Sequence, residues 1–246
     1  MSTDLATIEF SNRQGERLDA AFHPGKPDRG LVILGHGVTG NKDRPLLVGV
    51  AEGLSALGWP CLRISFSGNG DSEGSFGEAT VTKESEDLRD VLDQLPDDLK
   101  IAYCGHSMGA AVGLMTAAVD HRIRVVVNLA GMIRTEEFLE REFGDVEPDE
   151  GCMWDEPGCP LSRGYVDDME SIGDLLDEVG GLARPLLLIH GTADDVVLPE
   201  DSEEAFEAAS EPKSLIRIEG AGHSFEESGY EPLVSAIHEW LGEHLR

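Results

Sequence analysis

The chain has 246 residues, 40% of them hydrophobic, which is enough for one sizeable core, and we expect a single domain over residues 1–246. Its 48 acidic and 19 basic residues give a net charge of −29, and such a field repels nucleic acids and anionic membrane surfaces. No apolar run approaches the ~20 residues of a membrane-spanning helix, and no secretory signal precedes the first motif, so we expect a cytoplasmic protein.

Apolar runs alternate with helix-forming segments along most of the chain. Residues 5–10 and 17–22 are mixed in character and close in sequence, which predicts an antiparallel pair at the edge of a sheet. The later strands are continuous Val, Ile and Leu runs, typical of strands buried on both faces, at residues 31–35, 60–65, 100–104, 124–129, 185–190 and 214–218. Helices are predicted at residues 45–57, 81–95, 108–119, 200–209 and 231–245. This alternation predicts an α/β sheet with right-handed crossovers.

One long segment, residues 131–184, interrupts the alternation. It contains no convincing strand and is too long for a simple connection. Besides many carboxylates it carries large apolar side chains: Phe138, Phe143, Met153, Trp154, Leu161 and Tyr165. We expect a cap over the functional site, with Trp154 and Tyr165 lining a substrate pocket. The alternative is a surface insertion that packs on the sheet and never meets substrate.

Residues 105–109 (Gly-His-Ser-Met-Gly) match the G-x-S-x-G pattern of a catalytic serine. An apolar strand precedes them and a helix of small apolar residues follows, which places Ser107 on a sharp turn where glycines permit close packing. Residues 70–74 match the same pattern, but Ser72 is followed by Ser-Phe-Gly and not by an apolar helix. We therefore predict that Ser107 is the nucleophile and that Ser72 lies in a glycine-rich loop.

A catalytic serine needs a base and a group that orients the base. His223 lies in a glycine-containing loop after the last predicted strand, and we predict that it is the base. Asp194 and Asp195 both follow the penultimate strand, where the active sites of α/β proteins gather; we choose Asp194 and keep Asp195 as the alternative. His36 and His190 each end a strand before a glycine, and we interpret both as structural.

The anion formed during acyl transfer needs two backbone N–H donors. The Met108 amide directly follows the nucleophile and is the first candidate. The second should come from the loop after the third strand, residues 35–40, which offers several amides, and we choose Val38.

The four cysteines do not form the framework of a disulfide-rich protein in a chain of this length. Cys61 and Cys104 fall in predicted buried strands and are interpreted as core residues. Cys152 and Cys159 lie in a loop-like region without a second Cys/His pair, so we expect no metal site there.

The acidic excess is spread along the whole chain, and lysine is scarce, with five residues. This pattern fits an ordinary acidic protein, but it fits better a protein of a salt-rich cytoplasm, where a Debye length of roughly 3 Å at 1 M salt screens self-repulsion. We favour the salt-adapted interpretation.

The motifs occur together in an order typical of a known family. The chain resembles the serine α/β-hydrolase superfamily, and within it the small esterases related to cinnamoyl and feruloyl esterases and to the monoglyceride-lipase and S33-peptidase-like group. The matching segments are residues 36–42, 65–74, 105–109, 190–197 and 222–224. The sequence Ser-Gly-Asn-Gly at residues 67–70 departs from the Gly-His-Gly that relatives often carry. The departure leaves the triad residues in place, but it leaves the assignment to one subfamily open.

The resemblance implies an α/β-hydrolase fold with about eight mostly parallel strands and a helical cap after the sixth strand. It also implies catalysis by Ser107, Asp194 and His223, oxyanion donors at Val38 and Met108, and no cofactor.

We therefore expect a hydrolase of carboxylic esters that acts through an acyl-enzyme. The acidic surface disfavours strongly anionic substrates, so we expect small esters that are neutral or weakly charged. A thioesterase, a peptidase or an acyltransferase on the same triad is the alternative, and a non-catalytic binding protein on a hydrolase scaffold is the least favoured. The sequence leaves the oligomeric state open.

Overall fold

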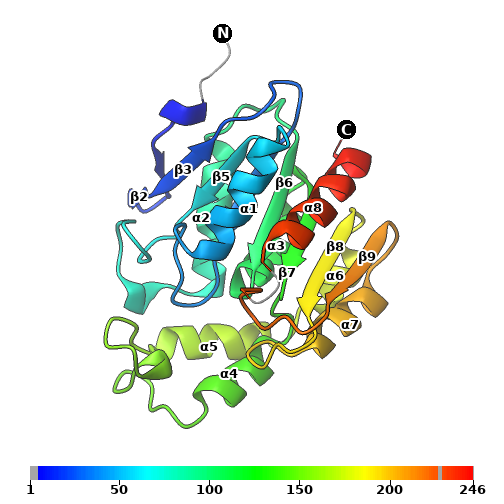
Figure 1. Ribbon diagram of the computed structural model, residues 1–246. Helices are drawn as coiled ribbons and strands as arrows, with labels where there is room; N and C mark the ends of the chain where they lie inside the picture. The colour runs from blue at the N-terminus through cyan, green and yellow to red at the C-terminus, as the bar shows by residue number, and fades with distance from the viewer. Residues whose placement is uncertain (1–4, 227–228, 246) are drawn as a thin grey trace.

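The computed structural model of the protein describes residues 5–226 and 229–245. Its described part is built on a seven-stranded sheet in the order β3-β5-β4-β6-β7-β8-β9 (Figure 1). All neighbouring strands are parallel except β3, which runs antiparallel to β5. The strands are β3 (Ala20–His23), β4 (Leu31–Gly35), β5 (Cys61–Ile64), β6 (Ile101–His106), β7 (Ile123–Leu129), β8 (Leu186–Gly191) and β9 (Lys213–Ile218).

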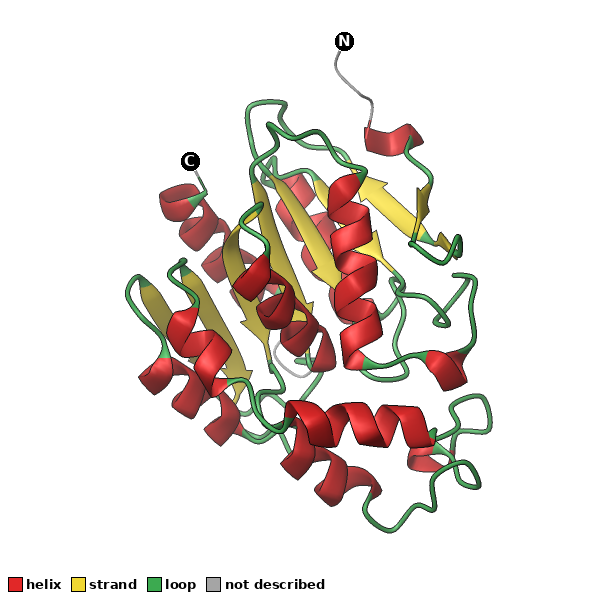
Figure 2. Cartoon of the chain, turned by 180° about the vertical axis from the view of Figure 1, so that it is seen from behind, coloured by secondary structure: helices red, strands yellow, loops and turns green. Residues whose placement is uncertain are grey.

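Helices cover both faces of the sheet, which explains why the central strands are apolar throughout. Every residue of β4, β5 and β8 is buried. Helices α1 (Pro45–Ala56) and α8 (Glu231–His244) pack on one face (Figure 1). The other face carries α2 (Val81–Asp93), α3 (Met108–Val119), α6 (Leu176–Gly181) and α7 (Pro199–Ala208) (Figure 2). The α/β-hydrolase fold class and the five predicted helices are thereby confirmed.

Local sequence signals set the starts of several helices. Pro45 occupies the first turn of α1, where its missing N–H costs no hydrogen bond. The hydroxyl of Thr80 accepts a hydrogen bond from the Lys83 amide at 3.0 Å and caps α2.

The N-terminal region differs from the prediction. Residues 5–10 do not form a strand, since Leu5–Thr7 is a 3-10 helix and only Phe10 enters β1 (Phe10–Ser11). Strand β1 pairs with β2 (Arg17–Leu18) in a separate two-stranded sheet. The predicted strand 17–22 breaks at Asp19. The Asp19 carbonyl accepts a hydrogen bond from the Ser65 amide, and the Asp19 amide donates one to the Ser72 hydroxyl, both at 2.8 Å. The described main sheet therefore has seven strands and not eight.

The segment 131–184 connects β7 to β8 and is helical where it is regular. It contains α4 (Thr135–Phe143), a short 3-10 helix η3 (Met153–Asp155), α5 (Arg163–Ile172) and α6. Helices α4 and α5 pack on each other and lie beyond the carboxyl ends of the central strands (Figure 2). An antiparallel bridge between Cys152 and Pro160 closes the loop that carries η3.

Both ends of this segment are held by the body of the protein. The Asp201 carboxylate, in the first turn of α7, accepts hydrogen bonds from the amides of Ile133 at 2.8 Å and Arg134 at 3.2 Å. At the other end Arg184 donates to the carbonyl of Ala117 at 2.9 Å. The chain therefore leaves and rejoins the sheet layer at fixed points.

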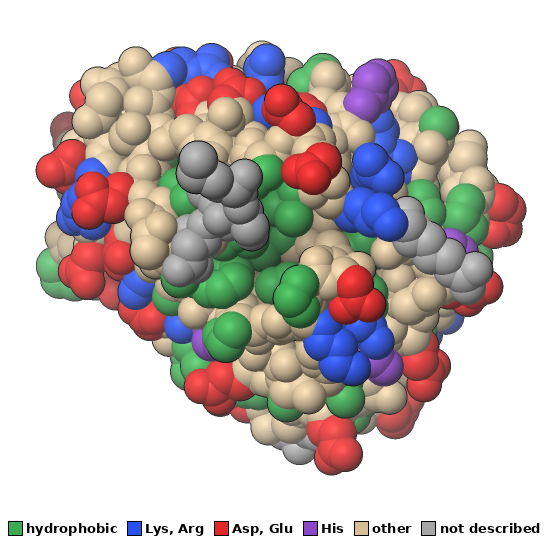
Figure 3. All heavy atoms as spheres, turned by 90° about the horizontal axis from the view of Figure 1, so that it is seen from above, with side chains coloured by type: hydrophobic (Ala, Val, Ile, Leu, Met, Phe, Trp, Pro, Cys, Tyr) green, Lys and Arg blue, Asp and Glu red, His purple; other side chains and the backbone are tan. Residues whose placement is uncertain are grey.

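Acidic and basic side chains are interspersed on the face opposite α4 and α5 (Figure 3). The net charge of −29 is thus not gathered into one patch on this face. None of the helices in residues 5–226 and 229–245 has both the length and the apolar character needed to cross a bilayer.

Candidate active site

Ser107 lies on a strained turn between β6 and α3. Its backbone has φ 56° and ψ −124°, a conformation that costs energy for any residue with a side chain. The turn is possible because a Cβ on Gly105 would lie 2.3 Å from the Gly109 carbonyl oxygen, and one on Gly109 would lie 2.5 Å from the carbonyl oxygen of His36. The glycines on either side of Ser107 therefore allow the strand, the helix and the neighbouring loop to approach closely.

Ser107 and His223 meet at one cavity, of about 280 Å³, at the carboxyl end of the sheet. Its wall comes from the loop after β4, the turn after β6, the loop after β8, the loop after β9 and the segment 131–184. The lining residues are Gly37, Val38, Gly40, Arg44, His106, Ser107, Trp154, Val196, His223 and Ser224.

Asp194 lies behind His223 and orients it. The Nδ1 atom of His223 donates to Asp194 Oδ2 at 2.8 Å, while the amides of Val196 and Val197 donate to Oδ1 at 3.0 and 3.1 Å. Burial raises the pKa of this carboxyl, but the hydrogen bonds from His190 and His223 outweigh burial and lower the pKa below its usual value.

Asp194 is 5% exposed, whereas Asp195 points to solvent. Of the two aspartates it is thus Asp194 that lies beside the imidazole.

His190 contributes to the site in a way that the sequence did not reveal. Its Nε2 atom lies 3.2 Å from Asp194 Oδ2 and 2.9 Å from the Val197 carbonyl oxygen. Both neighbours are acceptors, so Nε2 carries a proton. Its Nδ1 atom lies 2.7 Å from the Ser202 hydroxyl of α7. Asp194 is therefore held between two imidazoles, and the only sequence signal was the position of His190 at the end of a strand.

Two further histidines are neutral: His36 is fully buried, and His106 is partly buried on the cavity wall. The His106 side chain donates from Nε2 to the carbonyl of His223 at 3.0 Å, and the two rings lie 4.7 Å apart. Burial, reinforced by His223, lowers the pKa of His106 to about 3. His36 accepts at Nε2 from the Phe66 amide and donates from Nδ1 to the Gly37 carbonyl, and burial lowers its pKa to about 4. Both rings thus fix loops that border the cavity.

The two amides expected to bind the oxyanion flank Ser107 in sequence or in space. Val38 lines the cavity and Met108 begins α3. Neither amide donates a hydrogen bond to another group within residues 5–226 and 229–245. Both N–H groups are thus without a hydrogen-bond acceptor among the described residues, as the sequence-based expectation requires.

The two aromatic residues expected in the pocket differ in position. Trp154 lines the cavity and is 43% exposed; its ring meets that of Phe143 edge-on, with centroids 4.8 Å apart, and its indole donates to Glu142 at 3.0 Å. Tyr165 does not line the cavity: it is 3% exposed, and its hydroxyl donates to Met108 Sδ at 3.5 Å. The expectation for Tyr165 is corrected, because its side chain is buried in the core, with its hydroxyl against Met108, and does not reach the cavity wall.

The remaining candidates have structural positions. The hydroxyl of Ser72 donates to the Ser65 carbonyl and accepts from the Asp19 amide, both at 2.8 Å, within a loop. Cys61 and Cys104 are buried in the sheet, and burial raises the pKa of the Cys61 thiol to about 12. No cluster of three or more Cys, His, Asp and Glu side chains suited to a metal ion occurs in the described part of the chain.

Comparison with known proteins agrees with this geometry. The α/β-hydrolase fold family matches residues 30–149. An uncharacterized protein of Mycobacterium tuberculosis is 28% identical over 184 residues, which is 74% of this chain and 59% of that protein. The palmitoyl-protein thioesterase ABHD10 of Homo sapiens, a mitochondrial protein, is 28% identical over 206 residues, which is 79% of this chain and 62% of that protein. The chain thus spans about three fifths of the length of these curated relatives.

A solved structure extends the likeness to the whole described fold. The ferulic acid complex of Est1E from Butyrivibrio proteoclasticus superimposes with a TM-score of 0.84 and 26% identity, covering 97% of this chain and 99% of that chain. The match includes the sheet, both helical layers and the segment between β7 and β8. The chain therefore has the α/β-hydrolase fold, and in sequence and structure it is similar to hydrolases of the esterase and thioesterase type.

Proposed function

We propose that the protein hydrolyses small carboxylic esters through an acyl-enzyme on Ser107. The observation that carries the proposal is the convergence of Ser107 and His223 on one cavity, with Asp194 fixed behind His223 by hydrogen bonds. The fold and the esterase relatives support an enzyme of the esterase or thioesterase type.

The proposed reaction uses only groups of the chain itself. His223 accepts the proton of the Ser107 hydroxyl as its Oγ atom attacks the ester carbonyl. The Val38 and Met108 amides stabilise the negative oxygen of the tetrahedral intermediate. His223 then protonates the departing alcohol, and a water molecule, deprotonated by His223, releases the acid from Ser107. Asp194 remains ionised and holds the imidazole in the tautomer that accepts at Nε2.

We further propose that segment 131–184 forms a cap over the site. Trp154 lies on the cavity wall although it belongs to this segment, which supports a role in substrate contact. Its backbone is held at φ 49° and ψ 35°, an unusual conformation for a large side chain, so the loop fixes the ring at a defined place.

A fluorophosphonate probe tests the proposal directly. The probe should modify Ser107 stoichiometrically, and mass spectrometry of the digested protein should locate the adduct on that residue. An adduct on another residue, or none under conditions where an ester is hydrolysed, would contradict the assignment. A structure of the adduct should place the phosphoryl oxygen about 2.7–3.1 Å from the Val38 and Met108 amides.

Thioester hydrolysis is the second candidate, because the relative from Homo sapiens is a palmitoyl-protein thioesterase. Oxygen esters and thioesters of the same acyl group separate the two activities. A kcat/KM that is higher for the thioester by more than the intrinsic difference in hydroxide reactivity would favour the thioesterase. Product analysis with added alcohol or amine separates hydrolysis from acyl transfer.

A further inference from the structure

The cavity at Ser107 differs in charge from the rest of the chain. The chain contains 48 acidic residues, yet no acidic residue of the described ranges 5–226 and 229–245 lines this cavity. Of the described residues that do line it, Arg44 alone carries a permanent charge, because the depressed pKa of His106, about 3, leaves that ring neutral. The described wall of the cavity therefore carries one cation, Arg44, while the ionised Asp194 lies behind His223 and does not line the cavity.

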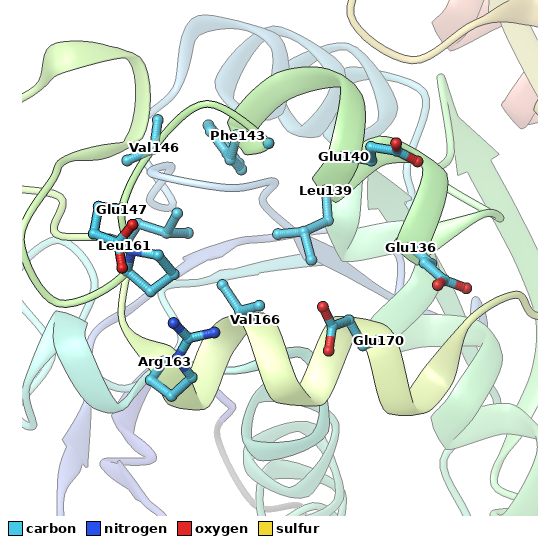
Figure 4. A pocket seen from close by; sticks show the side chains of 12 residues that line it. Glu136, Leu139, Glu140, Phe143, Val146, Glu147, Leu161, Arg163, Val166 and Glu170 are labelled. Carbon is cyan, nitrogen blue, oxygen red and sulfur yellow. The ribbon is translucent and has the colours of Figure 1, made fainter.

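A second cavity shows that this absence of carboxylates is not general. It measures about 340 Å³ and lies between α4 and α5, on the segment that also contributes Trp154 to the first cavity (Figure 4). Four of its lining residues are glutamates: Glu136, Glu140, Glu147 and Glu170. A neighbouring cavity thus follows the acidic composition of the chain, whereas the cavity at Ser107 does not.

Arg44 is placed so that most of its guanidinium group is available to a ligand. It directly precedes α1, and one nitrogen donates to the Thr39 carbonyl at 2.8 Å. This bond ties the side chain to the residue after Val38. Within residues 5–226 and 229–245 Arg44 forms no ion pair with a carboxylate, whereas Arg13 and Arg122 both do.

We propose that Arg44 selects esters that carry a carboxylate in the same molecule as the scissile bond. The inference rests on the proposed ester hydrolysis and specifies its substrate class. Arginine matches a carboxylate with two parallel N–H donors, and such charge-assisted bonds are stronger than neutral ones. The net charge of −29 repels an anion at long range, but salt screens that repulsion more than it screens a direct contact.

Matched substrates test the proposal in two arms. The first arm uses monomethyl esters of succinic, glutaric and adipic acids, which carry the carboxylate on the acyl side. The second uses acetyl esters of glycolic and 3-hydroxypropanoic acids, which carry it on the alcohol side. Each anion is compared with its primary amide, which has the same shape and no charge. The measured quantity is the ratio of kcat/KM for the anion to kcat/KM for the amide.

Arg44→Gln should lower this ratio by roughly tenfold or more in at least one arm, and Arg44→Lys should restore part of it. Arg124→Gln is the matched control, because it removes the same charge from an exposed residue near the start of β7, at the other end of the sheet from Ser107. It should leave the ratio unchanged.

The outcomes separate this inference from the proposed function. If the amide esters are hydrolysed but Arg44→Gln and Arg124→Gln change the ratio equally in both arms, selection by Arg44 is wrong and ester hydrolysis stands. If the unmodified protein hydrolyses neither member of any pair and Ser107 does not react with a fluorophosphonate, the proposed function itself fails. Melting curves of both Arg44 variants show whether the comparison is made on folded protein. In the unmodified protein at high salt, kcat/KM for the anion must exceed kcat/KM for its amide in the arm that Arg44 selects; a ratio of one or less in both arms would contradict the inference.

Discussion

The cavity at Ser107 and the cavity between α4 and α5 are similar in size and opposite in charge. They measure about 280 and 340 Å³. The first is lined by short backbone-rich loops, two histidines and one arginine, and the second by apolar side chains, four glutamates and Arg163 (Figure 4). Trp154 lines the first and makes an edge-on contact with Phe143, which lines the second, so this aromatic pair connects the two walls.

The difference shows that net charge describes the surface of this protein and not its site. From −29 alone we expected neutral or weakly charged substrates, because long-range repulsion disfavours strongly anionic ones. Arg44 is the permanently charged residue among the described residues of the cavity wall, and our proposal gives this local charge the larger part in substrate binding. The net charge of the chain therefore predicts solubility and the response to salt better than it predicts substrate specificity.

The comparison of the two cavities assumes that the reaction takes place at Ser107. Replacement of this nucleophile is the test with the largest expected effect. Ser107→Ala should lower kcat by about 10⁴-fold or more, since only binding and the oxyanion donors remain. Steady-state hydrolysis of a 4-nitrophenyl ester measures the loss. Ser72→Ala, which removes the serine of the other G-x-S-x-G sequence, should keep most of the activity. Equal losses in both variants would overturn the assignment.

Replacement of Asp194, which orients His223, should give the next largest loss of kcat. Asp194→Asn should lower kcat by roughly 10³- to 10⁴-fold, because an amide favours the wrong tautomer of His223. Asp195→Asn, one residue away and exposed, is the control and should retain near-normal turnover. Reversed losses in the two variants would show that the exposed carboxylate is the functional one.

The wall between the cavities can be tested with a pair of truncations. Trp154→Ala should change the ratio of kcat/KM for short and bulky esters by roughly 1–3 kcal/mol, the range typical of hydrophobic pockets. Val166→Ala, in the second cavity, should leave that ratio unaltered while lowering the melting temperature. If Trp154→Ala affects only the melting temperature, the segment packs on the protein without contacting substrate.

The glutamates of the second cavity should contribute to the salt dependence of the melting temperature. If the acidity is an adaptation to salt, the melting temperature should rise by several degrees or more from low salt to molar KCl. The triple replacement of Glu136, Glu140 and Glu170 by Gln should raise the low-salt melting temperature and reduce this dependence. Glu137→Gln is the control, since Glu137 already pairs with Arg134. A melting temperature independent of salt would identify an ordinary acidic protein.

The parts of the fold that the sequence predicted are those with a strong local pattern. Residues 31–35 are apolar throughout because strands pack on both sides and helices on both faces, and the structure places β4 there. Residues 5–10 misled the prediction because only Phe10 of the run is paired, and two-residue strands leave no periodic trace. The turn at Ser107 was predictable because its glycines are required by contacts within a few residues and one neighbouring loop.

The parts of the site that escaped prediction depend on contacts between distant elements. His190 contacts Asp194 four residues later and Ser202 in α7, and neither contact has a sequence signature. Tyr165 resembled a pocket residue because an aromatic side chain in a long insertion fits a core and a cavity equally well. Arg44 stood next to a proline at a helix start, and nothing in its surroundings in sequence placed it beside Ser107.

Two neighbouring residues in the first turn of α7 hold both the support of Asp194 and the start of segment 131–184. Ser202 supports His190 and through it Asp194, while the adjacent Asp201 holds the amides of Ile133 and Arg134. Rotation of the segment at its base would have to break the bonds to Asp201, which is next to the residue that supports His190. A movement within residues 135–183 would instead leave both anchors, at Arg134 and Arg184, and the support of His190 in place.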